Sequence, residues 1–142
     1  MDKGEKMDVL ENVLSKFDKA IYLESLIVVS KSDGKVLPVE KQFIETQASL
    51  LGVETDAYWK SEIDDISHID TSKLSNLTKR IIIRDCISLG YIDGDFDDSE
   101  RQDIYSISDL FNIEHEVVDK IENWLCEYWV LLKKGNELIG LP

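Results

Sequence analysis

The chain has 142 residues, enough for one domain with a buried core, and its 43% hydrophobic and 32% charged residues are ordinary for a globular protein. Its formal net charge of -13 disfavours nucleic acids and anionic membrane surfaces as partners, and it favours cations and basic proteins. Only two prolines and seven glycines argue against a loop-rich or all-β protein.

The N-terminal sequence MDKGEKMDVLENV has no apolar core of the kind found in signal peptides. No apolar run approaches the roughly 20 residues of a membrane span. We therefore expect a cytoplasmic protein without a transmembrane segment.

Apolar residues recur at helical spacing over residues 7–31 and predict a first helix. Its end, residues 26–29, is apolar on nearly all sides, which indicates a buried segment.

A corner follows the first predicted helix at residues 32–37. Gly34 supplies the positive φ that a tight corner requires. Pro38 suits the first position of a helix and Gly52 suits the residue just past its end. These signals predict a second helix over residues 38–51.

Two further helices are predicted in the middle of the chain. The first covers about residues 55–66 and has an acidic end. After a linker at residues 68–70, Thr71 or Ser72 is expected to cap the other, which runs to about residue 91.

The second corner, residues 93–97, also contains an Asp-Gly pair. Asp97 and Glu100 have the spacing of a capping box, with aspartate in place of serine or threonine. They predict a helix over residues 98–111, closed by Asn112, which tolerates the left-handed conformation.

The last predicted helix covers residues 114–134 and should stop at Gly135, leaving a loosely packed tail over residues 136–142. One apolar stripe of this helix is expected to pack in the core. Around Trp129 and Leu131 the helix becomes apolar on a second side as well. We predict that these two residues contact the first helix, a second subunit or another protein.

An internal repeat organises these elements, because residues 23–53 recur recognisably at residues 83–113. It predicts an all-α, compact helical bundle of two pseudo-symmetric helix–corner–helix repeats with about six helices. Repeat 1 would span about residues 8–66 and repeat 2 about residues 71–134, within a single domain of residues 1–142. At a uniform offset of sixty residues, the matched pairs are Asp33 and Asp93, Gly34 and Gly94, Glu40 and Glu100, Ile44 and Ile104, and Leu50 and Leu110.

One pattern occurs in both copies of the repeat: an apolar helix end, an Asp-Gly corner, a glutamate in the next helix and a leucine-containing finish. This pattern resembles the TerB-like (tellurite-resistance-type) all-helical domain over about residues 23–124. The resemblance implies a compact domain of bacterial stress-response systems, associated with tellurite and phage resistance and with divalent cations, calcium especially. It implies no established enzymatic activity. The residues that carry it are Asp33-Gly34, Glu40 and Leu50-Leu51-Gly52, then Asp93-Gly94, Asp95, Glu100 and Leu110.

The second corner is the candidate metal site, because five carboxylates lie close together there and Arg101 is the one basic residue beside them in the sequence. Ca²⁺ takes about six to eight oxygen ligands, and Mg²⁺ also binds carboxylates. We predict a site for Ca²⁺ (or Mg²⁺) formed by Asp93, Asp95, Asp97 and Glu100.

A purely structural interpretation of the same corner stays open. Asp97 would cap the following helix, while Asp98 and Glu100 would favour its positive N-terminus. Asp93 would then order the turn, and Asp95 would be left without a role.

The first corner is a weaker metal candidate, with only Asp33 and Glu40 as ligands. Lys35 and Leu37 occupy the positions at which the second copy has aspartates. A turn followed by a helix N-terminus is the alternative there.

Other residues favour structural roles. Cys86 and Cys126 lie in apolar helical patterns and are expected to be small buried hydrophobes without a disulfide. Arg80 and Arg84 are expected to pair with nearby carboxylates. The two histidines are isolated, and the sequence has no zinc or di-iron motif, phosphate loop or nucleophile elbow.

Three functional hypotheses follow from the sequence. The first is a non-enzymatic, TerB-like module that binds Ca²⁺ and acts in protein interaction or scaffolding. The second is a metal-independent interaction domain or oligomeric adaptor. The third is an enzyme with an unrecognised carboxylate site.

Overall fold

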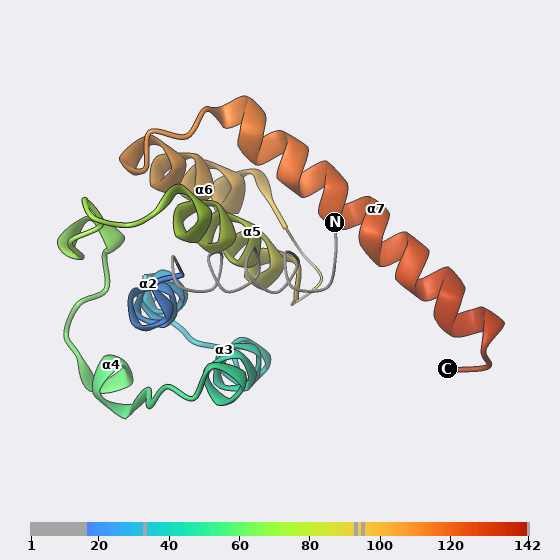
Figure 1. Cartoon of the computed structure of the whole chain (residues 1–142), viewed down its shortest axis with the longest axis horizontal. Coiled ribbons are helices and arrows are strands. Elements are labelled where there is room, and N and C mark those ends of the chain that lie inside the picture. Colours follow the sequence, from blue (N-terminus) through green and yellow to red (C-terminus); the bar gives the residue numbers. More distant parts are fainter. Residues whose placement is uncertain (1–16, 33, 93, 95, 142) are drawn as a thin grey trace, which may run out of the picture.

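A computed structural model describes residues 17–32, 34–92, 94 and 96–141 of the chain (Figure 1). Its regular secondary structure is entirely helical over these residues, which confirms the all-α prediction. None of the helices in this part of the chain is long and apolar enough to cross a membrane. The elements are α2 (Lys19–Lys31), α3 (Pro38–Leu51), α4 (Asp56–Lys60), the 3-10 turn η1 (Ile66–His68), α5 (Asn76–Ile92), α6 (Asp98–Leu110) and α7 (His115–Leu138).

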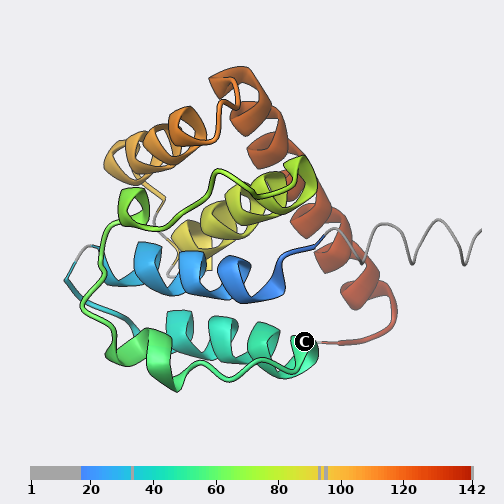
Figure 2. The same cartoon turned by 60° about the vertical axis from the view of Figure 1, so that its left-hand side comes forward.

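Two helical pairs form the body of the protein. α2 packs against α3 and α5 packs against α6, and a contact between α2 and α5 joins the pairs. Figure 2 shows α2 lying between α3 and α5. The shared core is fully or almost fully buried, which follows from each pair having an apolar face that it cannot cover alone. Its central residues include Leu23, Leu26 and Ile27 of α2 and Ile82, Ile83 and Ile87 of α5.

The two pairs have matching local geometry at positions sixty residues apart. Gly34 and Gly94 have φ values of 82° and 89° in the two corners. The second helix of each pair ends in a left-handed residue, Gly52 (φ 69°) and Asn112 (φ 56°). These matches agree with the repeat at the local level, while a two-fold relation between the whole pairs stays a prediction.

The first described helix begins later than predicted. Phe17 and Asp18 are not helical, and α2 begins at Lys19. The backbone N–H of Asp18 donates to Oγ1 of Thr78 on α5 (3.1 Å), so a contact between the two pairs fixes this point of the chain. The prediction of one continuous helix is therefore wrong here, and its first part, residues 7–16, lies outside the described residues.

The helix predicted to start at residue 55 is much shorter than expected. α4 ends at Lys60, and the next regular element is the turn η1. Lys31 of α2 donates through Nζ to the carbonyl oxygens of Tyr58 (3.2 Å) and Ser61 (2.6 Å). A cation on the last carbonyls is a favourable helix end. This cation comes from Lys31 of α2, so the sequence around α4 does not reveal it.

The predicted cap of the next helix is also wrong, because α5 begins at Asn76. Ser72 instead donates through its N–H and its hydroxyl to Oδ1 of Asp70, which forms a local turn. The capping residue is Ser75, whose Oγ accepts the backbone N–H three residues on (3.1 Å).

The last helix continues through Gly135 to Leu138, so the predicted stop and part of the predicted tail are wrong. A single glycine in a helix costs only about 1 kcal/mol, which flanking helical residues can offset. The actual end is at Gly140 (φ 82°), where the N–H of Leu141 donates to the carbonyl of Asn136 (2.8 Å). This bond, donated by the residue that follows the left-handed glycine, is the signature of a Schellman end.

Candidate functional site

An acidic groove of about 1120 Å³ lies between the two corners and is lined by residues of both. Its lining includes Lys35 of the first corner with Glu40 of α3, and Asp97 of the second corner with Glu100 of α6. Lys35 is the only basic side chain among its described lining residues. The carboxylates of this lining are Glu40, Asp64, Asp65, Asp97, Glu100, Asp103 and Asp109.

Asp97 occupies the predicted capping position. Its Oδ1 accepts the backbone N–H of Glu100 (2.8 Å), and α6 begins at the next residue, Asp98. The capping prediction is confirmed. Asp98 is not among the lining residues of the groove, and its Oδ1 accepts from Nη1 of Arg101 instead (3.1 Å).

Removing this cap is expected to cost about 1 kcal/mol. In Asp97→Ala, the N–H of Glu100 loses its acceptor, so the midpoint of urea unfolding should fall without a change in slope. Asp98→Ala is the matched control, because its ion pair is exposed and should contribute less than about 0.5 kcal/mol. Equal losses in the two variants would contradict the capping role.

Gly90 of α5 allows the second corner to approach closely. A Cβ at this position would lie 2.5 Å from Cδ2 of Phe96 and 3.0 Å from Oε2 of Glu100. The Phe96 ring has two partners, because it stacks on Tyr91 with ring centres 4.7 Å apart and its centre lies 4.9 Å from the guanidinium of Arg101. The absence of a side chain at Gly90 thus helps to set where Glu100 stands in the groove.

Glu40 at the first corner has structural partners. Its Oε1 accepts the backbone N–H of Leu37 (3.1 Å), and its Oε2 accepts from the hydroxyl of Ser30 (3.2 Å). Glu40 therefore reaches back to stabilise the start of α3, where Leu37 cannot supply the capping oxygen that Asp97 supplies to α6.

The predicted metal ligands are only partly covered by the structure. Asp97 and Glu100 lie in the groove, whereas Asp93, Asp95 and Asp33 lie outside the described residues. Within the described residues, no group of three or more His, Cys, Asp or Glu side chains is arranged to bind a metal. The proposed ligand set thus stays a prediction.

Two groups that line the groove have displaced pKa values with clear structural causes. The pKa of Asp65 lies below its usual range because the backbone N–H and the hydroxyl of Ser67 both donate to its carboxylate. Burial raises the pKa of the Cys86 thiol well above its usual range. The first shift reflects a local turn and the second reflects the core.

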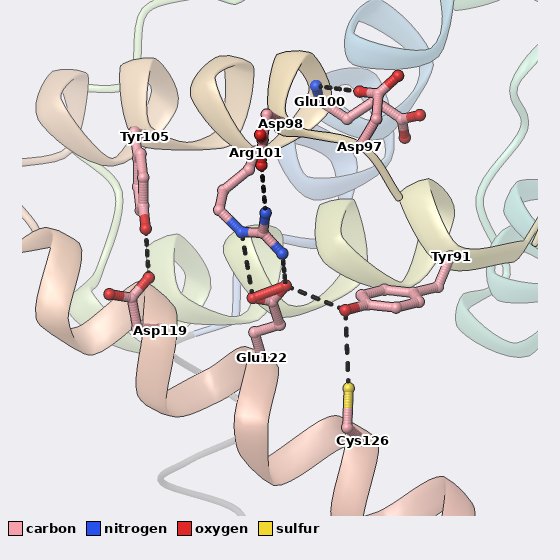
Figure 3. Close-up of polar contacts among 9 residues, drawn as sticks. All are labelled: Tyr91, Asp97, Asp98, Glu100, Arg101, Tyr105, Asp119, Glu122 and Cys126. Atoms are coloured by element: carbon pink, nitrogen blue, oxygen red, sulfur yellow. Dashed lines mark hydrogen bonds and ion pairs between the residues drawn. The ribbon is translucent and has the colours of Figure 1, made fainter. Parts of the chain in front are cut away.

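A polar network fixes the second corner onto α7 (Figure 3). Arg101 donates to Glu122 of α7 through Nη2 (2.6 Å) and Nε (3.4 Å), and this pairing raises the pKa of the guanidinium. The hydroxyl of Tyr91 also donates to Glu122 (3.0 Å), and the thiol of Cys126 lies 3.7 Å from the same hydroxyl. A further hydrogen bond joins Tyr105 to Asp119.

Sequence reasoning identified Arg101 as the basic residue at the corner but missed its principal partner. Glu122 lies 21 residues away, on a different helix. No short motif joins the two residues, so only the packing of α7 reveals the pair.

The remaining predicted side chains have the following places. Arg84 pairs with the buried carboxylate of Asp85 (2.8 Å), which confirms its predicted role, and Tyr22 also donates to this carboxylate. Arg80 is exposed. The two cysteines form no disulfide, and of these Cys86 is buried whereas Cys126 is only partly buried.

The predicted interface residues on α7 differ in their surroundings. Trp129 is partly buried, and its ring centre lies 5.3 Å from that of Tyr91, so this residue packs against the core. Leu131 is 69% exposed. Of these two predicted residues, Leu131 is the one with a largely exposed apolar side chain.

Comparison with known proteins supports the fold. A crystal structure of a tellurite resistance protein from Nostoc punctiforme PCC 73102 superimposes with a TM-score of 0.72 and 23% sequence identity, covering 87% of this chain and 80% of that chain. The chain has a TerB-like fold. No protein-family model and no curated protein sequence matches it. At 23% identity the likeness establishes the fold alone. The acidic groove described above is a feature of this chain.

Proposed function

We propose that the chain is a non-enzymatic, cytoplasmic module of a tellurite-resistance-type stress response that binds a divalent cation, Ca²⁺ in the first place, in its acidic groove. The observation that carries the proposal is the meeting of both corners in one groove, with seven carboxylates and one lysine among its described lining residues. The similarity to a tellurite resistance protein supports the stress-response setting.

The chemistry of the groove suits a hard cation. Ca²⁺ prefers carboxylate and carbonyl oxygens in flexible geometry, and Mg²⁺ prefers fewer carboxylates with bound water. Asp97 and Glu100 would supply ligands together with Asp93 and Asp95. A bound cation would also reduce the mutual repulsion of carboxylates in a chain with a net charge of -13.

Thermal unfolding with millimolar Ca²⁺, with Mg²⁺ and with EDTA tests the proposal. A cation at about 100 times its dissociation constant stabilises the folded state by about 2.7 kcal/mol, which corresponds to a rise of several degrees in Tm. We expect such a rise with Ca²⁺ in the wild type and its loss in Asp95→Asn and in Glu100→Gln.

Asp98→Asn is the matched control for these variants. It removes a carboxylate from the same corner, but this carboxylate is not among the groove residues. The variant should keep the response to Ca²⁺. Identical melting curves for the wild type in Ca²⁺ and EDTA would contradict cation binding and leave the corner as a turn and a helix cap.

A second candidate function is a metal-independent interaction domain or oligomeric adaptor. The observation that favours it is the exposed apolar surface on the second half of α7, which includes Leu131. Catalysis by a groove carboxylate is the third candidate. It ranks last because the pKa shifts resolved at Asp65 and Cys86 in this lining arise from a local turn and from burial in the core.

A further inference from the structure

A second apolar stripe runs along α7, away from its core-facing side. Trp124, Tyr128, Leu131 and Leu138 are 52%, 47%, 69% and 87% exposed, and Gly135 lies on the same line. The steps between successive members are four, three, four and three residues. This is the spacing of residues that meet along the seam of a two-helix coiled coil.

The stripe is separate from the side of α7 that packs on the body. Val118 and Leu125 are buried on that side, where α7 contacts α5 and α6. With 3.6 residues per turn, the line through Tyr128 and Leu131 lies roughly 100° around the helix from Leu125. Figure 1 shows the second half of α7 running beyond α5 and α6.

We infer that this stripe binds the same stripe of a second copy of the chain, with the two α7 helices antiparallel. We align the two helices so that Trp124 faces the partner's Gly135, because the largest side chain of the stripe then meets its smallest residue. Tyr128 faces the partner's Leu131. The inference deepens the second function proposed above, that of an oligomeric adaptor, and does not depend on cation binding.

Charge complementarity favours a second copy of the chain as the partner and an antiparallel arrangement of the two α7 helices. Glu127 and Lys134 flank the stripe on one edge, both exposed, and neither forms an ion pair with a described side chain. In an antiparallel pair, Glu127 faces the partner's Lys134, and the two-fold axis produces this contact twice. A parallel pair would place Glu127 beside Leu132 and gain no charge pairing.

The local charge also permits two acidic chains to meet here. Residues 123–141 contain two lysines and two glutamates and are therefore neutral, although the whole chain has a net charge of -13. Two copies that approach through this segment avoid the repulsion between their acidic surfaces.

Sedimentation velocity of the full chain, from about 1 to about 200 µM, tests the inference. We expect a monomer–dimer equilibrium in the micromolar range, typical of a small interface. Leu131→Glu should raise the dissociation constant at least about 100-fold, because it places a charge at the centre of the seam. Leu131 is largely exposed within one copy, so the circular dichroism spectrum and Tm at low concentration should not change.

Charge reversal tests the direction of the pair. Glu127→Lys and Lys134→Glu should each raise the dissociation constant about tenfold, and an equal mixture of the two variants should restore dimerisation. Lys133→Glu is the matched control, since it makes the same charge change on the opposite side of the helix. It should leave the dimer unaffected.

Three results would overturn the inference. They are a monomer at every concentration, a dimer insensitive to Leu131→Glu, and charge variants that do not rescue each other. A monomer at every concentration is also the result expected if residues 1–16 of the same chain, and not a second copy, cover the stripe. Cation binding is judged separately by the melts in Ca²⁺, so either proposal can fail without the other.

Discussion

Replacing Arg101 with methionine is expected to lower the free energy of unfolding by about 2–3 kcal/mol. The guanidinium donates twice to Glu122, whose side chain is only 13% exposed. Methionine keeps most of the packing volume, so the loss comes mainly from leaving a partly buried carboxylate without its cation. Urea unfolding at neutral pH measures the difference, and Tm should fall by about 3 to 5 °C per kcal/mol.

The exposed pair of Lys120 and Glu116 is the control for this prediction. Both side chains are more than two thirds exposed and lie one helical turn apart on α7. Lys120→Met should therefore cost no more than about 0.5 kcal/mol. A double variant, Arg101→Met with Glu122→Leu, should recover part of the stability, because the unpaired carboxylate is then removed as well. No recovery would show that the pair does not act as a unit.

Replacing Gly90 with alanine is expected to destabilise the protein by about 2 kcal/mol, against the usual trend for glycine in a helix. Alanine normally gains about 1 kcal/mol there, but here its methyl group would overlap the ring of Phe96. The ring cannot move without giving up its contacts with Tyr91 and Arg101. The displaced corner should also weaken any stabilisation by Ca²⁺, because Glu100 lies against the same position.

Gly135→Ala is the matched control, because Gly135 also lies within a helix but, unlike Gly90, has space for a methyl group. A Cβ there would have no heavy atom within 4 Å, so alanine should stabilise α7 by about 0.5–1 kcal/mol when measured at low protein concentration. Opposite signs for the two substitutions are the expected result. A stabilising Gly90→Ala would mean that Phe96 does not pack as described.

The second corner separates what local sequence could predict from what it could not. The Asp97 cap and the left-handed ends at Gly52 and Asn112 were predictable, because each depends on hydrogen bonds or backbone angles within a few residues. The site that contains Asp97 was not predictable, because its other wall comes from a corner sixty residues earlier in the chain.

The errors in helix length have the same origin. α4 ends where Lys31 of α2 reaches its carbonyls, and α2 begins where Asp18 bonds Thr78 of α5. Local propensities are worth at most about 1 kcal/mol per residue, so one contact from another helix can shift a boundary by several residues.

The helical class, the repeated corner and the resemblance to the TerB-like domain can be read from the amino-acid order, because periodicity, caps and turn residues act over short distances. Three features emerge only from the folded chain: both corners face one acidic groove, Arg101 pairs with Glu122, and α7 keeps a second apolar stripe exposed. These features depend on which faces of distant helices bury each other, and that is set by the packing of the whole core.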